Sequence, residues 1–296
     1  MQILDGKSVA QAVKEDLTKK AAAFLVETGK KPHLAAILVG HDGASETYVA
    51  SKIRNCEEVG FDSTLVRLPA DTPENHLISE VKKLNADERI DGILVQLPLP
   101  SHIDESSIIN LIDPAKDVDG FHPQNAGKLM LGLDGYIPAT PYGIMLMLEF
   151  YGIETAGKHA VVIGRSNIVG RPMSVLLSRN GNPGNCTVTL CHSRTKNLKD
   201  ICLTADIIVA ALGKPKFLTA DYVKDGAVVI DVGITRVADS TKKSGYRLYG
   251  DVDFDAVAPK TSAITPVPGG VGLMTIGALL KNTFHAAEAR HKANKT

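Results

Sequence analysis

The chain of 296 residues is long enough for two domains, because a single hydrophobic core seldom grows beyond about 250–300 residues. Its 33 basic and 33 acidic side chains cancel, which leaves no overall electrostatic footprint for nucleic acid or an anionic membrane. No apolar run approaches the roughly 18–20 residues of a membrane span, and the segment after Met1 lacks the pattern of a signal peptide. We therefore expect neither nucleic acid nor membrane as a partner.

The first part of the chain alternates apolar runs of strand length with helical patterns. The expected strands cover residues 34–39, 63–68 and 92–97, and the expected helices cover residues 44–59, 73–84 and 105–112. Such alternation is typical of βαβ units and a parallel sheet. Pro98 and Pro100 follow the third strand and suggest a rigid wall beside it.

Pro138 and Pro141 punctuate the chain before an apolar helix at 142–151, so we place the first domain boundary there. A second series then follows, with strands expected at 160–163, 186–191, 207–212 and 227–232 and helices at 170–179, 196–203 and 220–223. This series predicts a doubly wound parallel sheet of Rossmann type. A polar, exposed loop is expected at 239–245 and a long final helix at 273–289.

The expected fold class is therefore α/β, with two α/β domains. Residues 1–139 together with 273–296 are expected to form one domain, and residues 140–272 the Rossmann-type domain.

Residues 161–172 read Val-Val-Ile-Gly-Arg-Ser-Asn-Ile-Val-Gly-Arg-Pro, which indicates a strand, a glycine-containing turn and the start of a helix. Such a turn offers free backbone N–H groups to a phosphate, and the helix dipole favours an anion there. The order Gly164, Ser166, Gly170 departs from the usual Gly-x-Gly-x-x-Gly, so the pattern alone also fits a turn without a ligand.

The end of the next strand indicates which cofactor the turn would bind. NAD-binding proteins usually carry an acidic residue at this place, which accepts hydrogen bonds from the ribose. Here the chain reads His192-Ser193-Arg194 and has no carboxylate. An arginine pairs well with a phosphate, so NADP is favoured over NAD, although a solvated surface arginine is the alternative. Asp231-Val232-Gly233-Ile234 ends a later strand, where ligands of open α/β sheets bind, but this signal is weak alone.

Tyr48 and Lys52 are spaced i, i+4 and so share one helix face. Such a pair is suited to acid–base chemistry, but Tyr and Lys are also common on exposed helices. Gln96 falls in the most apolar strand of this half, where a buried amide needs a partner, and Lys52 is the candidate. A glutamine on an edge strand that faces water is the alternative. Asp119 precedes a glycine in a turn, where Asp also occurs for local reasons.

Residues 265–272 read Thr-Pro-Val-Pro-Gly-Gly-Val-Gly, which predicts a constrained, bare loop against which a flat ligand could lie. A simple interdomain linker is the alternative, although linkers are usually more polar.

Taken together, six segments in this order make the chain closely similar to the bifunctional methylenetetrahydrofolate dehydrogenase/methenyltetrahydrofolate cyclohydrolase family. They are residues 48–52, 95–98, 116–120, 164–170, 192–195 and 265–272. The resemblance implies a Rossmann-type domain for NADP, an α/β catalytic domain, a cleft between them and a homodimer. It implies oxidation of 5,10-methylenetetrahydrofolate by NADP and hydrolysis of the methenyl product to 10-formyltetrahydrofolate.

The resemblance also implies roles for individual residues. Lys52 would assist water attack and proton transfer, Gln96 would hydrogen-bond it, and Asp119 would accept hydrogen bonds from the aminopyrimidine edge of the pterin. The catalytic residues that it implies are Lys52, Tyr48, Gln96 and Asp119. The substrate-binding residues that it implies are Tyr48, Gln96, Leu97, Asp119, Pro268, Gly269 and Gly270. The cofactor-binding residues that it implies are Gly164, Arg165, Ser166, Ser193, Arg194 and Ile234.

Two positions depart from the family pattern: Ala139 stands where some members carry cysteine, and Leu273 where proline is expected.

The sequence leaves three other functions open. A monofunctional dehydrogenase or cyclohydrolase would share the fold, and a non-catalytic folate- or nucleotide-binding regulator would share the pockets. A short-chain-type reductase also uses Tyr-x-x-x-Lys, but there the glycine turn precedes the pair, whereas here it follows.

The cysteines and histidines give no sign of a metal site. Cys56, Cys186, Cys191 and Cys202 lack the paired spacing of a zinc site and are few for a disulfide scaffold, and the nine histidines show no ligand spacing. We therefore predict no metal, reduced thiols packed as small apolar side chains, and a cytoplasmic or equivalent reducing compartment.

Overall fold

The computed structural model describes residues 1–242, 245–293 and 295. They form two compact units. The six-stranded unit comprises Met1–Ala10 and Ala139–Thr275, and the three-stranded unit comprises Gln11–Pro138 and Ile276–Thr296. Both units combine helices with parallel strands, as the alternating pattern of the sequence predicts.

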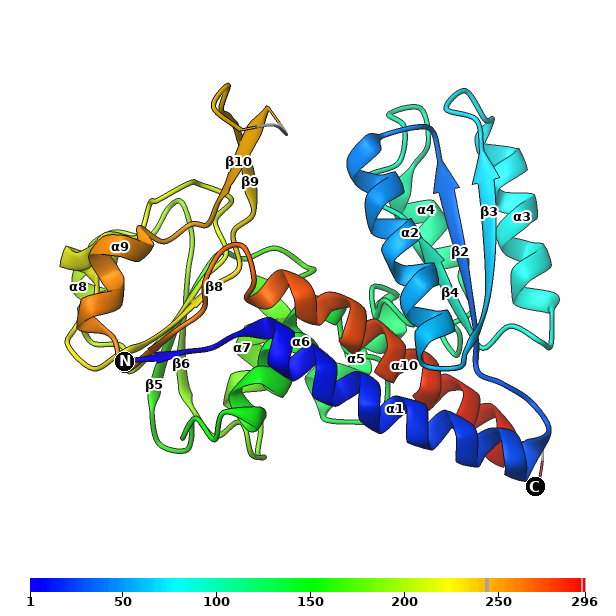
Figure 1. The fold of residues 1–296 in the computed structure, drawn as a ribbon, viewed down its shortest axis with the longest axis horizontal. Helices are drawn as coiled ribbons and strands as arrows, with labels where there is room; N and C mark the ends of the chain where they lie inside the picture. The colour runs from blue at the N-terminus through cyan, green and yellow to red at the C-terminus, as the bar shows by residue number, and fades with distance from the viewer. Residues whose placement is uncertain (243–244, 294, 296) are drawn as a thin grey trace. The chain divides into compact units, whose positions relative to one another are not determined.

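The three-stranded unit is built on a parallel sheet with strand order β3-β2-β4. Its strands are β2 (His33–Val39), β3 (Asp62–Leu68) and β4 (Gly92–Val95). Strand β2 is central, and six of its seven residues are buried, as expected where helices cover both faces of a sheet. Figure 1 shows helices α2 (Gly43–Glu58) and α3 (Glu74–Ala86) on opposite sides of this sheet.

Alternation along the strands sends one set of side chains towards α3 and the short helix α4 (Glu105–Leu111). Ala35, Ile37 and Val39 of β2 share a core with Leu77 and Val81 of α3. This unit also contains helix α5 (Pro123–Leu131), most of α1 (Gly6–Thr28) and most of α10 (Val271–Ala293). The packed sheet is the rigid base from which the loops after β4 and α4 project.

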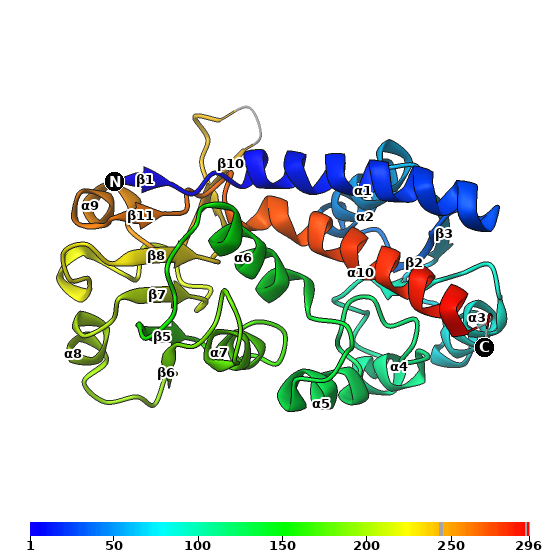
Figure 2. The same cartoon turned by 90° about the horizontal axis from the view of Figure 1, so that it is seen from below.

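The six-stranded unit has a parallel sheet with strand order β1-β11-β8-β7-β5-β6. The strands are β1 (Gln2–Ile3), β5 (His159–Ile163), β6 (Thr187–Cys191), β7 (Ile207–Ala210), β8 (Val228–Asp231) and β11 (Ala263–Ile264). Figure 2 shows β11, β8, β7, β5 and β6 side by side in this order. From β5 the chain first adds β6 on one side and then β7 on the other, so the order reverses between β5 and β7.

Helices cover this sheet on both faces, as in a doubly wound fold. The helical segments of this unit are α6 (Ala139–Phe150), α7 (Gly170–Ser178), α8 (Leu198–Leu203), α9 (Phe254–Val257) and the 3₁₀ turns Ala220–Tyr222 and Ala258–Lys260. Val161 and Ile163 of β5 share a core with Cys202 of α8 and Val257 of α9. Helix α7 packs against β5 and β6.

A two-stranded antiparallel hairpin, β9 (Thr235–Ala238) and β10 (Tyr246–Tyr249), forms a separate sheet. The loop expected at 239–245 is the connection of this hairpin. Its residues Ser240 to Lys242 and Gly245 are exposed, and residues 243 and 244 lie outside the described part of the chain.

The compact units differ from the expected division at residues 273–275, which lie in the six-stranded unit, and at the N-terminus, where Met1–Ala10 join the same unit through strand β1. At the N-terminus the reason is that β1 pairs in parallel with β11 at the edge of that sheet. All four cysteines are free and buried. None of the helices in the described residues is both long and apolar enough to cross a membrane.

Candidate active site

Helix α2 presents Tyr48 and Lys52 from one face while its other face joins the core. The Asp42 side chain caps the helix by accepting a hydrogen bond from the Ser45 N–H at 2.8 Å. Val49 is fully buried, whereas Tyr48 is 41% exposed. The tyrosine ring is therefore free to stack on a ligand, and Lys52 follows it one helical turn later.

Lys52 meets Gln96 across the unit, as the resemblance implies. The Lys52 Nζ donates to the Gln96 Oε1 at 3.0 Å, and the Gln96 Nε2 donates to the Leu97 carbonyl at 2.7 Å. The expected strand 92–97 is too long, because β4 ends at Val95. The Gln96 N–H still donates a strand-type hydrogen bond to the Ile37 carbonyl. Pro98 has no N–H with which to continue the hydrogen bonding of the strand.

Asp119 is the second charged group of this cluster, and its ionisation depends on that of Lys52. Burial lowers the pKa of Lys52 below its usual range, and the Asp119 carboxylate opposes this shift. Burial likewise raises the pKa of Asp119 to about 6, and Lys52 opposes that shift. The structure therefore brings Lys52, Gln96 and Asp119 together, with a lysine that releases a proton more readily than a solvated one.

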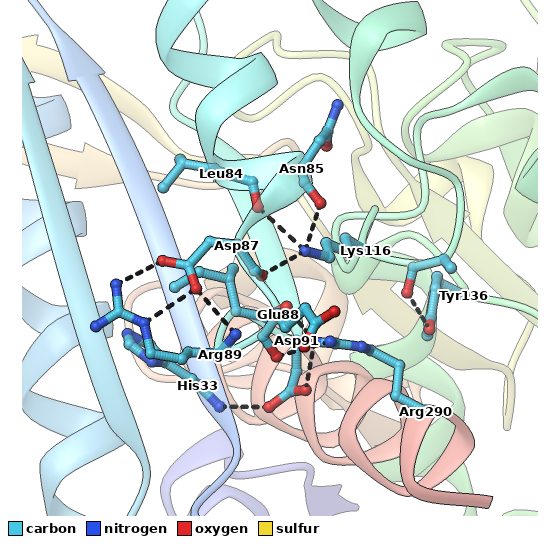
Figure 3. A network of polar contacts seen from close by, with 12 residues as sticks. His33, Leu84, Asn85, Asp87, Glu88, Arg89, Asp91, Lys116, Tyr136 and Arg290 are labelled. Atoms are coloured by element: carbon cyan, nitrogen blue, oxygen red, sulfur yellow. Dashed lines mark hydrogen bonds and ion pairs between the residues drawn. The ribbon is translucent and has the colours of Figure 1, made fainter. Parts of the chain in front are cut away.

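The segment that carries Asp119 is fixed by Lys116, which is 4% exposed. Figure 3 shows its Nζ directed at the end of helix α3, where it donates to the carbonyls of Leu84, Asn85 and Asp87 at 3.1, 2.8 and 2.8 Å. A cation is favourable at a helix C-terminus, where carbonyl groups lack partners. The Tyr136 hydroxyl donates to the Ala115 carbonyl at 2.7 Å on the other side of Lys116.

Asp117 holds the same segment from its other end. Its carboxylate accepts from the N–H groups of Phe121 and His122 and from the Asn125 side chain at 3.2, 2.8 and 2.9 Å. Two buried charged residues, Lys116 and Asp117, thus precede Asp119 and leave its backbone little freedom.

In the six-stranded unit, strand β5 leads through a glycine turn into α7. Gly164 has φ +129°, and a Cβ there would lie 2.2 Å from the Ala211 carbonyl oxygen. A Cβ on Gly170 would lie 1.9 Å from the Gly164 carbonyl oxygen, so both positions require glycine for close packing. The Ser166 Oγ accepts from the N–H groups of Val169 and Gly170 at 3.2 and 3.4 Å and so closes the turn before the helix.

The turn leaves a row of backbone donors facing solvent. Residues Arg165 to Ile168 are exposed, and within the described residues none accepts a hydrogen bond from their four N–H groups. Free N–H groups at the start of a helix favour a phosphate. The geometry of the turn thus fits a pyrophosphate group.

Ser193 and Arg194 lie at the adjacent strand end, because Ile163 of β5 pairs with Cys191 of β6. Both side chains are exposed. Their turn is fixed by the Arg194 N–H, which donates to the His192 Nδ1 at 3.1 Å, and by the His192 N–H, which donates to the Thr195 Oγ1 at 2.8 Å. The positions of Ser193 and Arg194 beside the glycine turn suit the ribose end of a dinucleotide.

Ile234 and the Pro-Gly loop belong to the same unit. Ile234 is 45% exposed and follows β8, and a Cβ on Gly272 would lie 2.8 Å from its Cδ1. Gly269 accepts a hydrogen bond from the Gly6 N–H at 2.8 Å, which ties the loop to the N-terminal segment. Pro268, Gly269 and Gly270 therefore lie in the six-stranded unit, whereas Tyr48, Lys52, Gln96, Leu97 and Asp119 lie in the three-stranded unit.

The sequence reasoning missed Asp251, which is fully buried at the carboxyl edge of the six-stranded sheet beside Asp231. The sequence carries no local signal for it, because its partners are backbone groups of distant segments. The described part of the chain holds no group of three or more His, Cys, Asp or Glu side chains that could bind a metal ion.

Two family models match the chain. The model of the tetrahydrofolate dehydrogenase/cyclohydrolase catalytic domain matches residues 4–119, and that of the NAD(P)-binding domain of the same family matches residues 138–291. The bifunctional protein FolD of Cytophaga hutchinsonii is 61% identical over 97% of this chain and 99% of its own length.

Solved structures agree. The FolD methylenetetrahydrofolate dehydrogenase/cyclohydrolase of Campylobacter jejuni has a TM-score of 0.91 at 48% identity, over 98% of this chain and 99% of that one. FolD of Trypanosoma brucei, solved with NADP and an inhibitor, has a TM-score of 0.92 at 40% identity, over 97% of each chain. The chain belongs to the tetrahydrofolate dehydrogenase/cyclohydrolase family.

Proposed function

We propose that this protein oxidises 5,10-methylenetetrahydrofolate to 5,10-methenyltetrahydrofolate with NADP and then hydrolyses the methenyl compound to 10-formyltetrahydrofolate. The family and its bifunctional relatives support both reactions. The observation that carries the proposal is the cluster of Lys52, Gln96 and Asp119, in which burial lowers the pKa of the lysine. A proton acceptor of this kind serves the hydrolytic step, which a simple nucleotide binder does not need.

Hydrolysis begins when water attacks the one-carbon bridge of the methenyl cation. As the carbon–oxygen bond forms, the Lys52 Nζ accepts a proton from the water. The adduct then collapses to the formyl group, the bond to N5 breaks, and N5 takes up a proton. Gln96 orients Lys52 through the 3.0 Å hydrogen bond, and the cationic substrate itself favours the neutral lysine.

The three-stranded unit is proposed to hold the folate. Asp119 accepts hydrogen bonds from the aminopyrimidine edge of the pterin, a charge-assisted contact of the strong class. The exposed ring of Tyr48 stacks on the substrate, and Leu97 lies beside Gln96 in the same wall. Pro268, Gly269 and Gly270 of the six-stranded unit are proposed as further substrate-binding residues.

The residues of the six-stranded unit fit NADP. Gly164, Arg165 and Ser166 form the turn whose free N–H groups suit the pyrophosphate. The exposed Ser193 and Arg194 suit a 2′-phosphate, and no carboxylate stands between His192 and Lys196 to repel it. Ile234 would contact the nicotinamide end. When bound, the nicotinamide accepts the hydride, so the protein has only to orient the two reactants.

A paired assay on one preparation tests the function. NADPH absorbance should rise when methylenetetrahydrofolate and NADP are added, and methenyltetrahydrofolate should be hydrolysed in the absence of NADP. A single activity would identify a monofunctional enzyme. Binding of both ligands without either activity would identify a regulator, and both of these results would contradict the proposal.

We also propose a homodimer, which the resemblance implies. The β9–β10 hairpin supports it, because an isolated two-stranded ribbon gains stability by packing against another surface, and its Val237 is 38% exposed. Light scattering should give twice the chain mass.

The four free thiols support a cytoplasmic or equivalent reducing compartment.

A further inference from the structure

Two buried aspartates, Asp231 and Asp251, lie together at the carboxyl edge of the six-stranded sheet. Asp231 is 3% exposed and Asp251 is fully buried. Neither forms an ion pair with a basic side chain within the described residues. Burying two carboxylates side by side costs free energy, and hydrogen bonds from neighbouring groups must offset this cost.

Asp251 binds the loop that follows β7. Its Oδ2 accepts from the N–H groups of Leu212 and Gly213, and its Oδ1 accepts from the Lys214 N–H at 2.7 Å. Three consecutive backbone donors therefore converge on one carboxylate. Without it, these three partly buried N–H groups would have no partner within the described residues.

Asp231 binds the loop that follows its own strand and the segment that carries Asp251. It accepts from the N–H groups of Gly233, Asp251 and Val252 at 3.0, 2.8 and 3.0 Å. Burial raises the pKa of Asp231 to about 7, against the effect of these three donors. The two carboxylates thus form one chain of hydrogen bonds that links three loops.

Glycines let these segments approach. A Cβ on Gly233 would lie 2.4 Å from the Asp251 Oδ1, and a Cβ on Gly250 would lie 1.9 Å from the Asp231 Oδ2. Each carboxylate is therefore matched by a glycine in the segment of the other. This reciprocal fit fixes the distance between the loop after β8 and the segment after β10.

The position of these loops relates them to the cofactor. In an open α/β sheet, the ligand binds outside the carboxyl ends of the strands where the strand order reverses, here between β5 and β7. The loop after β7 borders that point, and Gly164 packs directly against its Ala211. The loop after β8 continues into Ile234.

We propose that Asp231 and Asp251 are positioning residues, which hold the loops after β7 and β8 in the conformation that receives the nicotinamide half of NADP. This inference rests on the proposed function. All six donors that the two carboxylates bind lie outside the named strands and helices, so the pair organises loops at the ligand edge. Apolar side chains could fill the same volume, but they could not bind these N–H groups.

The first test is Asp251→Asn, because an amide offers one acceptor oxygen and turns an NH₂ group towards backbone donors. We expect the Kd for NADP, measured by titration calorimetry, to rise at least about tenfold. Hydrolysis of methenyltetrahydrofolate without NADP should stay within twofold of wild type. A merely structural loss would lower both activities together and leave the Kd of the folded fraction unchanged, and this result would overturn the inference.

The second test perturbs the same loop without touching the core. Gly213 has φ +67° with open space around a Cβ, so Gly213→Ala strains the loop after β7 and nothing else. Gly226→Ala is the matched control, since Gly226 has φ +80° and equally open space around a Cβ. It lies before β8, at the end of the sheet opposite to the carboxyl ends of the strands.

Gly213→Ala should weaken NADP binding several-fold and leave the rate of hydrolysis unchanged, whereas Gly226→Ala should change neither NADP binding nor hydrolysis. If Asp251→Asn does not fold, wild-type NADP affinity in Gly213→Ala overturns the inference. Failure of the wild-type protein to bind NADP would overturn the proposed function as well, so the two failures are distinguishable.

Discussion

The two units present their functional groups in opposite ways. In the three-stranded unit, the proposed reactive groups are partly buried side chains whose pKa values are shifted by burial, as in Lys52 and Asp119. In the six-stranded unit, the proposed cofactor contacts are exposed backbone donors and the exposed side chains of Ser193 and Arg194. From this difference we expect the three-stranded unit to act through ionisable side chains and the six-stranded unit through fixed backbone geometry. Substitution of Lys52 should change the chemistry, and substitutions at the glycine turn should change the affinity for NADP.

The largest effect that we expect in the three-stranded unit is that of Lys52→Ala. Loss of a general acid–base group typically costs about 10²–10⁴-fold, so we expect hydrolysis of methenyltetrahydrofolate to fall by that factor. The Kd for NADP, measured by calorimetry, should not change, because Lys52 lies in the other unit. Hydrolysis at the wild-type rate in a folded Lys52→Ala protein would remove Lys52 from the mechanism.

Arg194→Ala should have the opposite effect, because it should lower the affinity for NADP and leave the chemistry intact. The guanidinium is exposed beside the glycine turn, where it can pair with a 2′-phosphate. We expect NADP to bind about 10–100-fold more weakly, whereas NAD, which lacks that phosphate, should change less than threefold. Hydrolysis without NADP is the internal control. An equal loss for both cofactors would contradict recognition of the phosphate by Arg194.

The sequence predicted the α/β class, the family and most elements, because apolar runs alternate with helical patterns along both units. It also predicted the hydrogen bond between Lys52 and Gln96, which is present. The roles of the proposed site residues stay predictions. These successes come from patterns that are local in the chain or from motifs that occur in a fixed order.

The misses have different physical causes. Strand β1 has two exposed residues and pairs with β11, about 260 positions later, so no local pattern reveals it. Helix α1 did carry a signal, since Asp5 caps it and Val9, Val13 and Leu17 repeat at every fourth residue in its buried face. Asp251 was missed because its partners are backbone groups of distant loops, which a sequence does not display.

A smaller effect should follow from Lys116→Met, which tests whether the Asp119 segment must be held rigidly. The variant leaves the carbonyls of Leu84, Asn85 and Asp87 without their shared donor, so the free energy of unfolding should fall by about 2 kcal/mol. The KM for folate should rise about tenfold in both reactions, and the Kd for NADP should stay the same.

The matched control for that experiment is the exposed Lys82 of α3, the helix whose end Lys116 contacts. Lys82→Met removes an equal charge from α3 without touching the Asp119 segment, so stability and KM should both stay at wild-type values. A Lys116→Met protein that is less stable but keeps the wild-type KM would show that Lys116 supports the fold alone.

The smallest expected effect comes from pH. Burial raises the pKa of Asp119 to about 6, so this carboxylate is mostly ionised at pH 7 and half protonated near pH 6. If the ionised form accepts hydrogen bonds from the pterin, folate affinity should fall about twofold between pH 7 and pH 6, and more steeply below. Asp119→Asn should bind weakly at every pH, which separates the titration of Asp119 from that of the ligand. The sign is decisive, since an affinity that rises as the pH falls through 6 would mean that the protonated carboxyl group is the form that binds folate.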